Sequence, residues 1–289
     1  MEIGKAVIPA AGWGTRFLPQ TKAIPKEMLP LVDKPLIQHI VEEAAASGIE
    51  QIIIVTSPSK SAMEEHFGRS IELENVLEQK GEEGLLQEVR RIAGLANICY
   101  VRQEEQRGLG HAILTAREIV GHEPFAVFLP DDIFDAPVPV IKQMLEVYRR
   151  YGGCVIALCR VGEEGTRRFG IVKPKQVEER VYQVLDLVEK PGPEHAPSDL
   201  AILGRYILTP EIFEALEVTP PGKGGEIQLT DGLALLLKQQ AIYGYEFEGT
   251  YYDAGRPLGL LKATVALALK HPEMGAEFKE YLEKLIADL

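Results

Sequence analysis

Short apolar runs alternate with stretches of helical periodicity over the first half of the chain. In Pro35–Gly48 the apolar residues return on one stripe of a helix, with proline suited to the first turn and glycine to the position after the last turn. Residues 108–121 and 138–151 also have a helical pattern, and the apolar runs that predict strands cover residues 5–9, 51–56, 97–102, 125–129 and 154–159. This alternation predicts an α/β fold in which a mostly parallel sheet carries helices on both faces.

The second half of the chain has a less regular pattern. Three predicted strands, at residues 169–173, 180–190 and 201–208, follow one another with little helix between them, which favours antiparallel additions to the sheet. Helical patterns return at residues 230–239, 257–270 and 272–289. No linker rich in proline, glycine or serine divides the chain, so we expect residues 1–289 to form a single domain.

The composition excludes several classes of protein. A formal net charge of -12 argues against a surface that binds nucleic acid or an anionic membrane, because both favour dense lysine and arginine. The three cysteines form no CxxC pair and the six histidines have no metal-binding spacing, so neither a disulfide framework nor a zinc site is indicated. No apolar stretch approaches the roughly 20 residues of a membrane span, and the first residues lack the apolar region of a signal peptide. We therefore expect a cytoplasmic protein.

A glycine-rich segment directly after the first predicted strand is suited to binding phosphate. Gly12 and Gly14 are followed by three cations, Arg16, Lys22 and Lys26. A bend of bare backbone N–H groups next to fixed positive charge is what a triphosphate requires. Phe17 stands where a dinucleotide fingerprint needs its third small residue, and the P-loop spacing is absent, which argues against a nicotinamide-dependent dehydrogenase and a P-loop NTPase.

Several longer motifs, in one order along nearly the whole chain, resemble those of the sugar-1-phosphate nucleotidyltransferases. They are Gly12-Trp13-Gly14-Thr15-Arg16, Ala23-Ile24-Pro25-Lys26-Glu27-Met28, Leu129-Pro130-Asp131-Asp132, Phe169-Gly170-Ile171-Val172, Val188-Glu189-Lys190-Pro191, Gly204-Arg205-Tyr206 and the segment from Gly225 to Asp231. The chain is most similar to the bacterial branch that makes UDP-glucose and pyrophosphate from UTP and glucose 1-phosphate with Mg²⁺. The resemblance implies a Rossmann-like three-layer α/β/α fold around a mixed, mostly parallel sheet. It also implies a nucleotide-binding half at residues 1–135, a sugar-phosphate-binding half at residues 136–255 and C-terminal helices at residues 256–289.

The resemblance implies roles for the residues of the first half. The backbone of Ala10, Ala11, Gly12 and Gly14 would hold uracil and ribose, while Thr15 and Arg16 would contact the β- and γ-phosphates. Lys26 would lie near the α-phosphate. Gln103 can read uracil, because its amide offers both a donor and an acceptor, and Gly108 would lie close to the base. Gln106 is expected to be solvated.

The resemblance also implies a metal site and a sugar-phosphate site. Asp131 follows a buried strand at the edge where open α/β sheets bind ligands, and Mg²⁺ takes few carboxylates beside phosphate and water. The second metal ligand would be Asp253, whose alternative role is to cap the helix that begins near Pro257. Glu189 would bind the sugar hydroxyls and Lys190 the sugar phosphate, with Gly170 allowing close approach. Alternation along a strand would separate Glu189 from Lys190, so their joint action needs a local bend.

The expected catalytic set is therefore Arg16, Lys26, Asp131 and Lys190, which must line one cleft. Two alternatives stay open: an enzyme that uses dTTP or CTP, and a non-catalytic protein that senses sugar nucleotides. A sensor need not keep Lys26, Asp131 or Lys190, and all three are present. The two terminal helices hold more apolar residues than an isolated tail needs, and the family is commonly dimeric or tetrameric, so we expect a homodimer or homotetramer.

Overall fold

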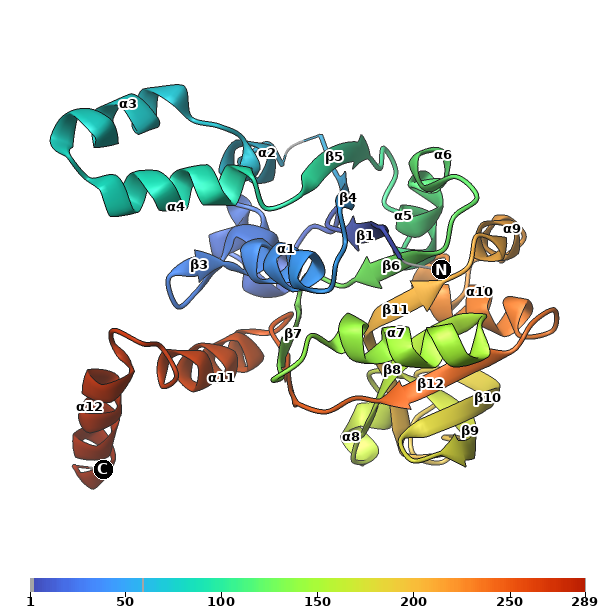
Figure 1. Cartoon of the computed structure of the whole chain (residues 1–289). Coiled ribbons are helices and arrows are strands. Elements are labelled where there is room, and N and C mark those ends of the chain that lie inside the picture. Colours follow the sequence, from blue (N-terminus) through green and yellow to red (C-terminus); the bar gives the residue numbers. More distant parts are fainter. Residues whose placement is uncertain (1–2, 59, 289) are drawn as a thin grey trace.

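A nine-stranded mixed sheet runs through the structure, a computed structural model that describes residues 3–58 and 60–288 (Figure 1). The strands lie in the order β5-β4-β1-β6-β11-β8-β12-β10-β9. They are β1 (Lys5–Pro9), β4 (Gln51–Thr56), β5 (Asn97–Arg102), β6 (Phe125–Phe128), β8 (Cys154–Arg160), β9 (Gly170–Glu178), β10 (Val181–Glu189), β11 (Leu200–Leu208) and β12 (Ile242–Glu246). The strands expected in the first half lie where the apolar runs predicted them.

The sheet is parallel in its first half and largely antiparallel in its second. β4 pairs in parallel with β5 and β1, and β1 with β6, whereas β11 runs antiparallel to β6 and β8, and β10 antiparallel to β12 and β9. Only β8 and β12 are parallel in the second half of the described sheet. The antiparallel additions expected in the second half are confirmed, but the sheet is not mostly parallel, because hairpins such as β9–β10 replace the helical crossovers that parallel neighbours need.

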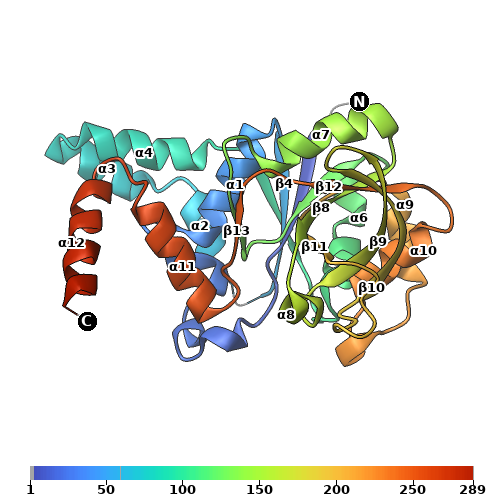
Figure 2. The ribbon, with the colours of Figure 1, turned by 90° about the horizontal axis from the view of Figure 1, so that it is seen from below.

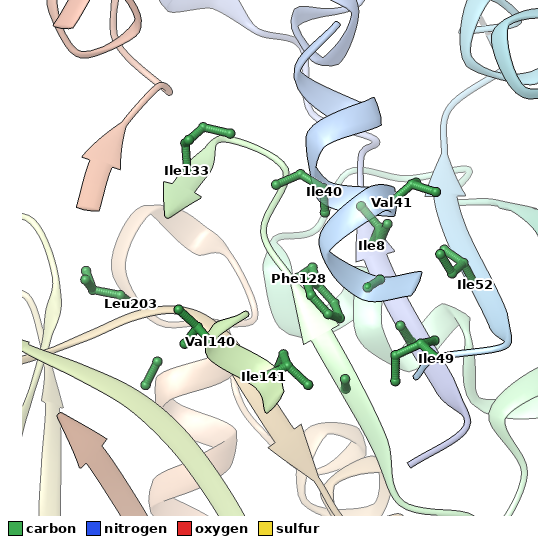
Figure 3. Packing of buried hydrophobic residues seen from close by; sticks show 14 of the residues in the cluster. Ile8, Ile40, Val41, Ile49, Ile52, Phe128, Ile133, Val140, Ile141 and Leu203 are labelled. Atoms are coloured by element: carbon green, nitrogen blue, oxygen red, sulfur yellow. The ribbon is translucent and has the colours of Figure 1, made fainter. Parts of the chain in front are cut away.

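Alternate residues of the central strands face two separate hydrophobic layers. In β1, Ala6 and Ile8 belong to the layer beneath α1 (Leu36–Ala46) and α7 (Val140–Tyr151), and Val7 belongs to the opposite layer. Figure 3 shows the first layer, where Ile8 lies near Ile40 of α1 and Phe128 of β6. The opposite layer is covered by α5 (Leu109–Thr115), α6 (Arg117–Val120), α9 (Glu211–Glu217) and α10 (Leu229–Leu236). Helices thus cover both faces of the sheet, as predicted.

Short elements at the ends of the strands build the surroundings of the site. β2 (Pro30–Leu31) pairs with β3 (Lys34–Pro35), and β7 (Asp132–Asp135) pairs with β13 (Thr250–Asp253). The antiparallel β7–β13 pair sets Asp253 directly opposite Asp132. The remaining short elements are η1 (Thr15–Phe17), η2 (Gln20–Lys22), η3 (Lys26–Met28), α8 (Glu163–Thr166) and η4 (Lys223–Gly225).

Two pairs of helices extend from one end of the molecule, remote from β9 and β10 (Figures 1 and 2). The first is a hairpin of α3 (Ile71–Lys80) and α4 (Glu83–Ala93), which follows α2 (Ala62–Phe67). The second is α11 (Pro257–Ala268) and α12 (Gly275–Ala287); the predicted last helix reaches Leu289, which lies outside the described residues. None of the described helices combines the length and the apolar character that a bilayer span demands.

Candidate active site

The glycine-rich loop begins at the carboxyl end of β1 and folds back through η1 and η2 toward η3. Gly14 has φ of 65°, and a Cβ at this position would lie 3.1 Å from the Cβ of Lys26 and 3.2 Å from Cγ2 of Thr21. The hydroxyl of Thr21 donates a hydrogen bond to the carbonyl oxygen of Gly14 at 2.8 Å. Glycine therefore allows both the left-handed backbone and the close approach of the loop to the turn that carries Lys26.

A cavity of about 430 Å³ adjoins this loop, the first turn of α5 and the end of β6. Its lining includes most of the residues predicted to bind the nucleotide: Ala11, Gly12, Gly14, Thr15, Lys26, Gln103 and Gly108. Ala10 does not belong to the lining. It is buried, its N–H donates to Val55 at 2.7 Å, and its carbonyl oxygen accepts from Nζ of Lys60 at 2.6 Å. Ala10 thus supports the loop and does not face the cavity.

The side of this cavity formed by residues 103–110 is tightly organised. Nε2 of Gln103 donates to Nδ1 of His111 at 2.8 Å and to the carbonyl oxygen of Gly108 at 3.4 Å, which leaves its amide oxygen for another partner. Gly108 has φ of 102°, and a Cβ there would lie 2.8 Å from the carbonyl oxygen of Ile227. Gln106, which we expected to be solvated, lines the cavity and donates to the carbonyl oxygen of Ala11 at 2.8 Å.

A second cavity, of about 500 Å³, adjoins the first, and the two share Lys26 and Asp131 in their linings. Arg16 and Lys190 line the second cavity as well. All four residues of the expected catalytic set therefore meet in one cleft, although they come from sequence positions between 16 and 190. Gly170, Glu189 and Asp253 also line this cavity.

Lys26 and Asp131 form an ion pair at the boundary between the two cavities. Nζ of Lys26 lies 2.5 Å from Oδ2 of Asp131, and both side chains are half-buried. Burial disfavours both charges, but the opposite charges outweigh it, so the pKa of Lys26 is raised and that of Asp131 is lowered. Both groups are therefore charged at neutral pH.

Asp253 lines the same cavity as this pair and is not a helix cap. Helix α11 begins at Pro257 with Arg256 at its N-cap, whereas Asp253 accepts a hydrogen bond from the N–H of Gly255 at 3.1 Å and forms an ion pair with Arg168. The capping alternative is therefore wrong.

Gly255 keeps the space between Asp131 and Asp253 open. A Cβ on Gly255 would lie 2.7 Å from Oδ2 of Asp131 and 3.1 Å from Oδ1 of Asp253. Among residues 3–58 and 60–288, no three carboxylate, imidazole or thiol groups converge as a ready metal site. Two carboxylates facing one open point suit a cation that takes its other ligands from phosphate and water.

Glu189 and Lys190 act side by side because the backbone turns sharply at the end of β10. Lys190 has φ of 48°, a conformation that residues other than glycine seldom adopt and that is concentrated at functional sites. Its Nζ lies 2.6 Å from Oε1 of Glu189, and the hydroxyl of Thr230 donates to Oε2 of Glu189 at 2.7 Å. The required bend is therefore present, at Lys190 itself. A Cβ on Gly170 would lie 3.3 Å from Oε2 of Glu189, so glycine leaves this carboxylate accessible.

Asp132 is a second carboxylate at the cleft, in a different environment from Asp131. It is buried, and the hydroxyl of Tyr251 donates to its Oδ1 at 2.7 Å. Burial and the negative charge of Asp131 raise the pKa of Asp132 to about 6. The pKa values of these adjacent carboxyl groups thus shift in opposite directions, because only Asp131 forms an ion pair with Lys26.

Sequence reasoning missed two arginines of the cleft. Arg167 and Arg168 line the second cavity, and Arg168 also lies over the ring of Phe169 at 5.2 Å. Two adjacent arginines close to the Gly170 motif could have indicated a binding site for an anion. Among the described residues, Arg16 and Arg167 form no ion pair, and the charge of Arg16 contributes to the lowered pKa of Asp131.

Comparisons with known proteins identify the family to which the chain belongs. The model of the nucleotidyl transferase family matches residues 5–269. A UTP–glucose-1-phosphate uridylyltransferase of Staphylococcus epidermidis is 54% identical over 284 residues, which are 98% of this chain and 99% of the relative.

Two solved structures extend the comparison to the fold. A UTP-bound UGPase from Acinetobacter baumannii is 41% identical with a TM-score of 0.92, covering 98% of this chain and 100% of that one. A UDP-glucose pyrophosphorylase in complex with UDP-glucose is 46% identical with a TM-score of 0.86, covering 93% of this chain and 100% of that one. The chain belongs to the nucleotidyl transferase family and, within it, to the bacterial UTP–glucose-1-phosphate uridylyltransferases.

Proposed function

We propose that the chain transfers a uridylyl group from UTP to glucose 1-phosphate, forming UDP-glucose and pyrophosphate. The observation that carries this proposal is the pair of adjoining cavities that share Lys26 and Asp131. One cavity has the glycine-rich loop and an amide for a base, and the other has a lysine and a carboxylate for a sugar phosphate. The shared residues lie where the two substrates would meet.

The reaction needs positioning and charge neutralisation more than a protein nucleophile. An oxygen of the sugar phosphate attacks the α-phosphorus of UTP in line, a new P–O bond forms, and the bond to the leaving pyrophosphate breaks. Both reactants are anions, so they repel each other until cations offset their charge. Arg16 and Arg167 supply unpaired charge, and Lys26 stands at the boundary where the phosphates would meet. Orientation of bound reactants can contribute up to about 7–11 kcal/mol.

Asp131 and Asp253 are the residues that would hold a magnesium ion, because they face the open point beside Gly255. A bound Mg²⁺ supplies Lewis-acid stabilisation of charge on the phosphate oxygens. The chain's own contribution is to keep Asp131 ionised through Lys26 and to hold Asp253 through Arg168 and the N–H of Gly255.

The remaining contacts support one substrate in each cavity. Gln103 would offer its amide oxygen to the N3–H of uracil, and Thr15, which lines the same cavity, would contact the phosphates. Glu189 would accept hydrogen bonds from sugar hydroxyls and Lys190 would donate to the sugar phosphate.

The test is release of pyrophosphate from UTP, dTTP and CTP, each with glucose 1-phosphate and Mg²⁺. We expect UTP to give the highest kcat/KM. Activity with dTTP should be measurable, because one methyl group changes discrimination by only about 1–3 kcal/mol. A preference for dTTP or CTP would reassign the nucleotide. Binding of UDP-glucose without any turnover would indicate a sensor.

We also propose that the chain forms a homo-oligomer through α11 and α12. Leu258 and Leu261 of α11 are more than 60% exposed, and so is Ile286 of α12. Of the described residues of α12, only Gly275 is buried. A second copy of the chain would remove these apolar side chains from water.

A further inference from the structure

Arg205 is the largest fully buried side chain in the described structure, and the reaction proposed above gives it no role. It belongs to the Gly204-Arg205-Tyr206 motif of β11 and does not line either cavity of the cleft. Burying a guanidinium is costly unless every donor is paired, so its position calls for an explanation.

All five N–H groups of Arg205 have acceptors. Two of them meet the carboxylate of Glu43 on α1, from Nε to Oε1 at 3.0 Å and from Nη2 to Oε2 at 2.5 Å. The other three meet backbone carbonyl oxygens, those of Gly204 at 2.8 Å, Leu129 at 3.3 Å and Asp132 at 3.0 Å. This planar fork cannot be reproduced by lysine.

Two of these carbonyl groups, those of Leu129 and Asp132, flank Asp131 in the sequence. The guanidinium also lies 4.9 Å from the ring centroid of Phe128, just before this loop, and 4.6 Å from that of Phe134, just after it. Arg205 therefore binds the Leu129–Asp132 loop at both of its ends. The two residues between them, Pro130 and Asp131, accept no hydrogen bond from it.

Gly204 holds the same loop from a second direction. A Cβ on Gly204 would lie 2.2 Å from Oδ2 of Asp132 and 2.7 Å from the Cβ of Leu129. The register of β11 against β8 shifts between Leu203 and Tyr206, so Gly204 and Arg205 form an irregularity in the strand. Such bulges are common next to active sites, where they re-aim a side chain.

We propose that Arg205 is a positioning residue, which fixes the Leu129–Asp132 loop so that Asp131 points to the boundary between the nucleotide and sugar-phosphate cavities. The proposal rests on the uridylyl transfer proposed above. Loss of the contacts would leave the substrate cavities in place but let Asp131 move relative to Lys26 and Asp253. Residues that orient a metal-binding carboxylate in this way change metal affinity or activity by about 10–100-fold.

The test removes the charge pair without leaving either partner alone in the core. The double variant Glu43→Leu/Arg205→Met replaces a buried ion pair by apolar side chains of similar size, a change that is often neutral or stabilising, so we expect a cooperative melt close to that of the wild type. We expect kcat to fall about 10–100-fold. We expect binding of Mn²⁺ alone, followed by electron paramagnetic resonance, to weaken by a similar factor. Affinity for UTP in EDTA, read from the fluorescence of Trp13, should be unchanged.

Gly204→Ala is the second variant, because it presses on the loop while leaving the Arg205–Glu43 pair intact. It should give the same pattern if the double variant fails to fold. Glu74→Gln, which alters a buried ion pair of the α3–α4 hairpin, is the matched control and should keep wild-type kcat.

Two failures are distinguishable. Folded variants with wild-type kcat and wild-type Mn²⁺ affinity would overturn the positioning role. A wild-type protein without uridylyl transfer would instead overturn the proposed function, and changed Mn²⁺ affinity in the variants would still support the contact between Arg205 and the loop.

Discussion

Individual residues of the cleft have separable roles, because each has a different partner. Asp131 pairs with Lys26, Asp253 with Arg168, and Glu189 with Lys190. These three carboxylates are thus neutralised in pairs, while Arg16 and Arg167 form no ion pair among the described residues. Substitution of one member of a pair should therefore affect one part of the reaction.

Asp131→Asn should reduce turnover about a thousandfold, because it removes charge stabilisation worth several kcal/mol and each 1.36 kcal/mol is tenfold in rate. The fold should persist, because the side chain is only half-buried. Pyrophosphate release and a thermal melt measure both effects. The matched control is Asp135→Asn, four residues after Asp131, which alters an ion pair with Lys270 outside the cleft. Full Mg²⁺-dependent activity in Asp131→Asn would contradict the metal assignment.

Lys190→Ala should raise KM for glucose 1-phosphate about 10–100-fold, because a hydrogen bond to a charged group is worth about 1.5–3 kcal/mol. Affinity for UTP, read from Trp13 fluorescence, should be little changed. Lys190→Gly distinguishes the effect of the lost charge from that of the backbone conformation. It removes the same ammonium group, but glycine readily adopts the φ of 48°. Equal KM values in the two variants would assign the effect to the charge. A loss confined to UTP affinity would show that the two subsites are interchanged.

Gly255→Ala should lower activity at least tenfold while the protein remains folded. The added methyl group would lie between Asp131 and Asp253, at the point that a cation would share. Steady-state rates over a range of Mg²⁺ concentrations measure the effect. Gly84→Ala is the control, because a Cβ on Gly84 meets nothing within 4 Å. Equal activity in both variants would argue that this space is not used.

At the scale of elements, short strands position the carboxylates of the cleft, and a longer helix, α1, supports the loop that carries Asp131. The β7–β13 pair brings Asp253 opposite Asp132, although 121 residues separate them in the chain and neither strand was predicted. Arg205 then connects the end of β6 to α1 through Glu43. The helical hairpin α3–α4 lies outside the cleft and is held by its own charges.

Glu74 ties this hairpin together and gives a prediction for acid stability. It lies 2.6 Å from Nη2 of Arg69 and 2.9 Å from Nε of Arg90, and these arginines lower its pKa from 4.5 to about 2. Because the pKa of Glu74 is lower in the folded than in the unfolded chain, ionised Glu74 stabilises the folded state above pH 4.5. This contribution is lost as the pH falls toward 2. The Tm of wild type should therefore exceed that of Glu74→Gln at pH 7, and the difference should shrink below pH 4.5. A difference independent of pH would contradict this role.

At the scale of the whole molecule, the proposed oligomer surface begins beside the reacting cleft, because Arg256 at the N-cap of α11 lines the second cavity. The cleft is formed at the strand ends, whereas α11 and α12 extend away from β9 and β10 (Figures 1 and 2). Leu261 and Ile286 do not line the cleft, so substitutions at these two residues test assembly without touching it.

Leu261→Glu/Ile286→Glu should convert an oligomer into a monomer, because it places charges on two apolar side chains that are 61% and 69% exposed. Light scattering coupled to size exclusion measures the mass. Val218→Glu, at a residue 72% exposed near α9, is the control and should leave the mass unchanged. A wild-type mass equal to that of one chain would contradict the proposed assembly.

The sequence by itself determined the α/β class, the strands of the first half and many residues of the cleft, although not Arg167, Arg168 or Gln106. Local periodicity encodes strands such as β1 and β4, and the motif residues carry the groups that phosphates and a cation require. The pattern of the sequence overestimated the share of parallel strand pairs, because strand direction depends on pairing between distant segments.

Only the tertiary structure decided how these groups meet. The ion pair of Lys26 with Asp131 joins residues 105 positions apart, and that of Arg205 with Glu43 joins residues 162 positions apart. The turn at Lys190 and the burial of Arg205 also depend on neighbours that no local pattern specifies. Periodicity along the chain reports which face of an element is buried, whereas pairing of charges depends on which elements pack together.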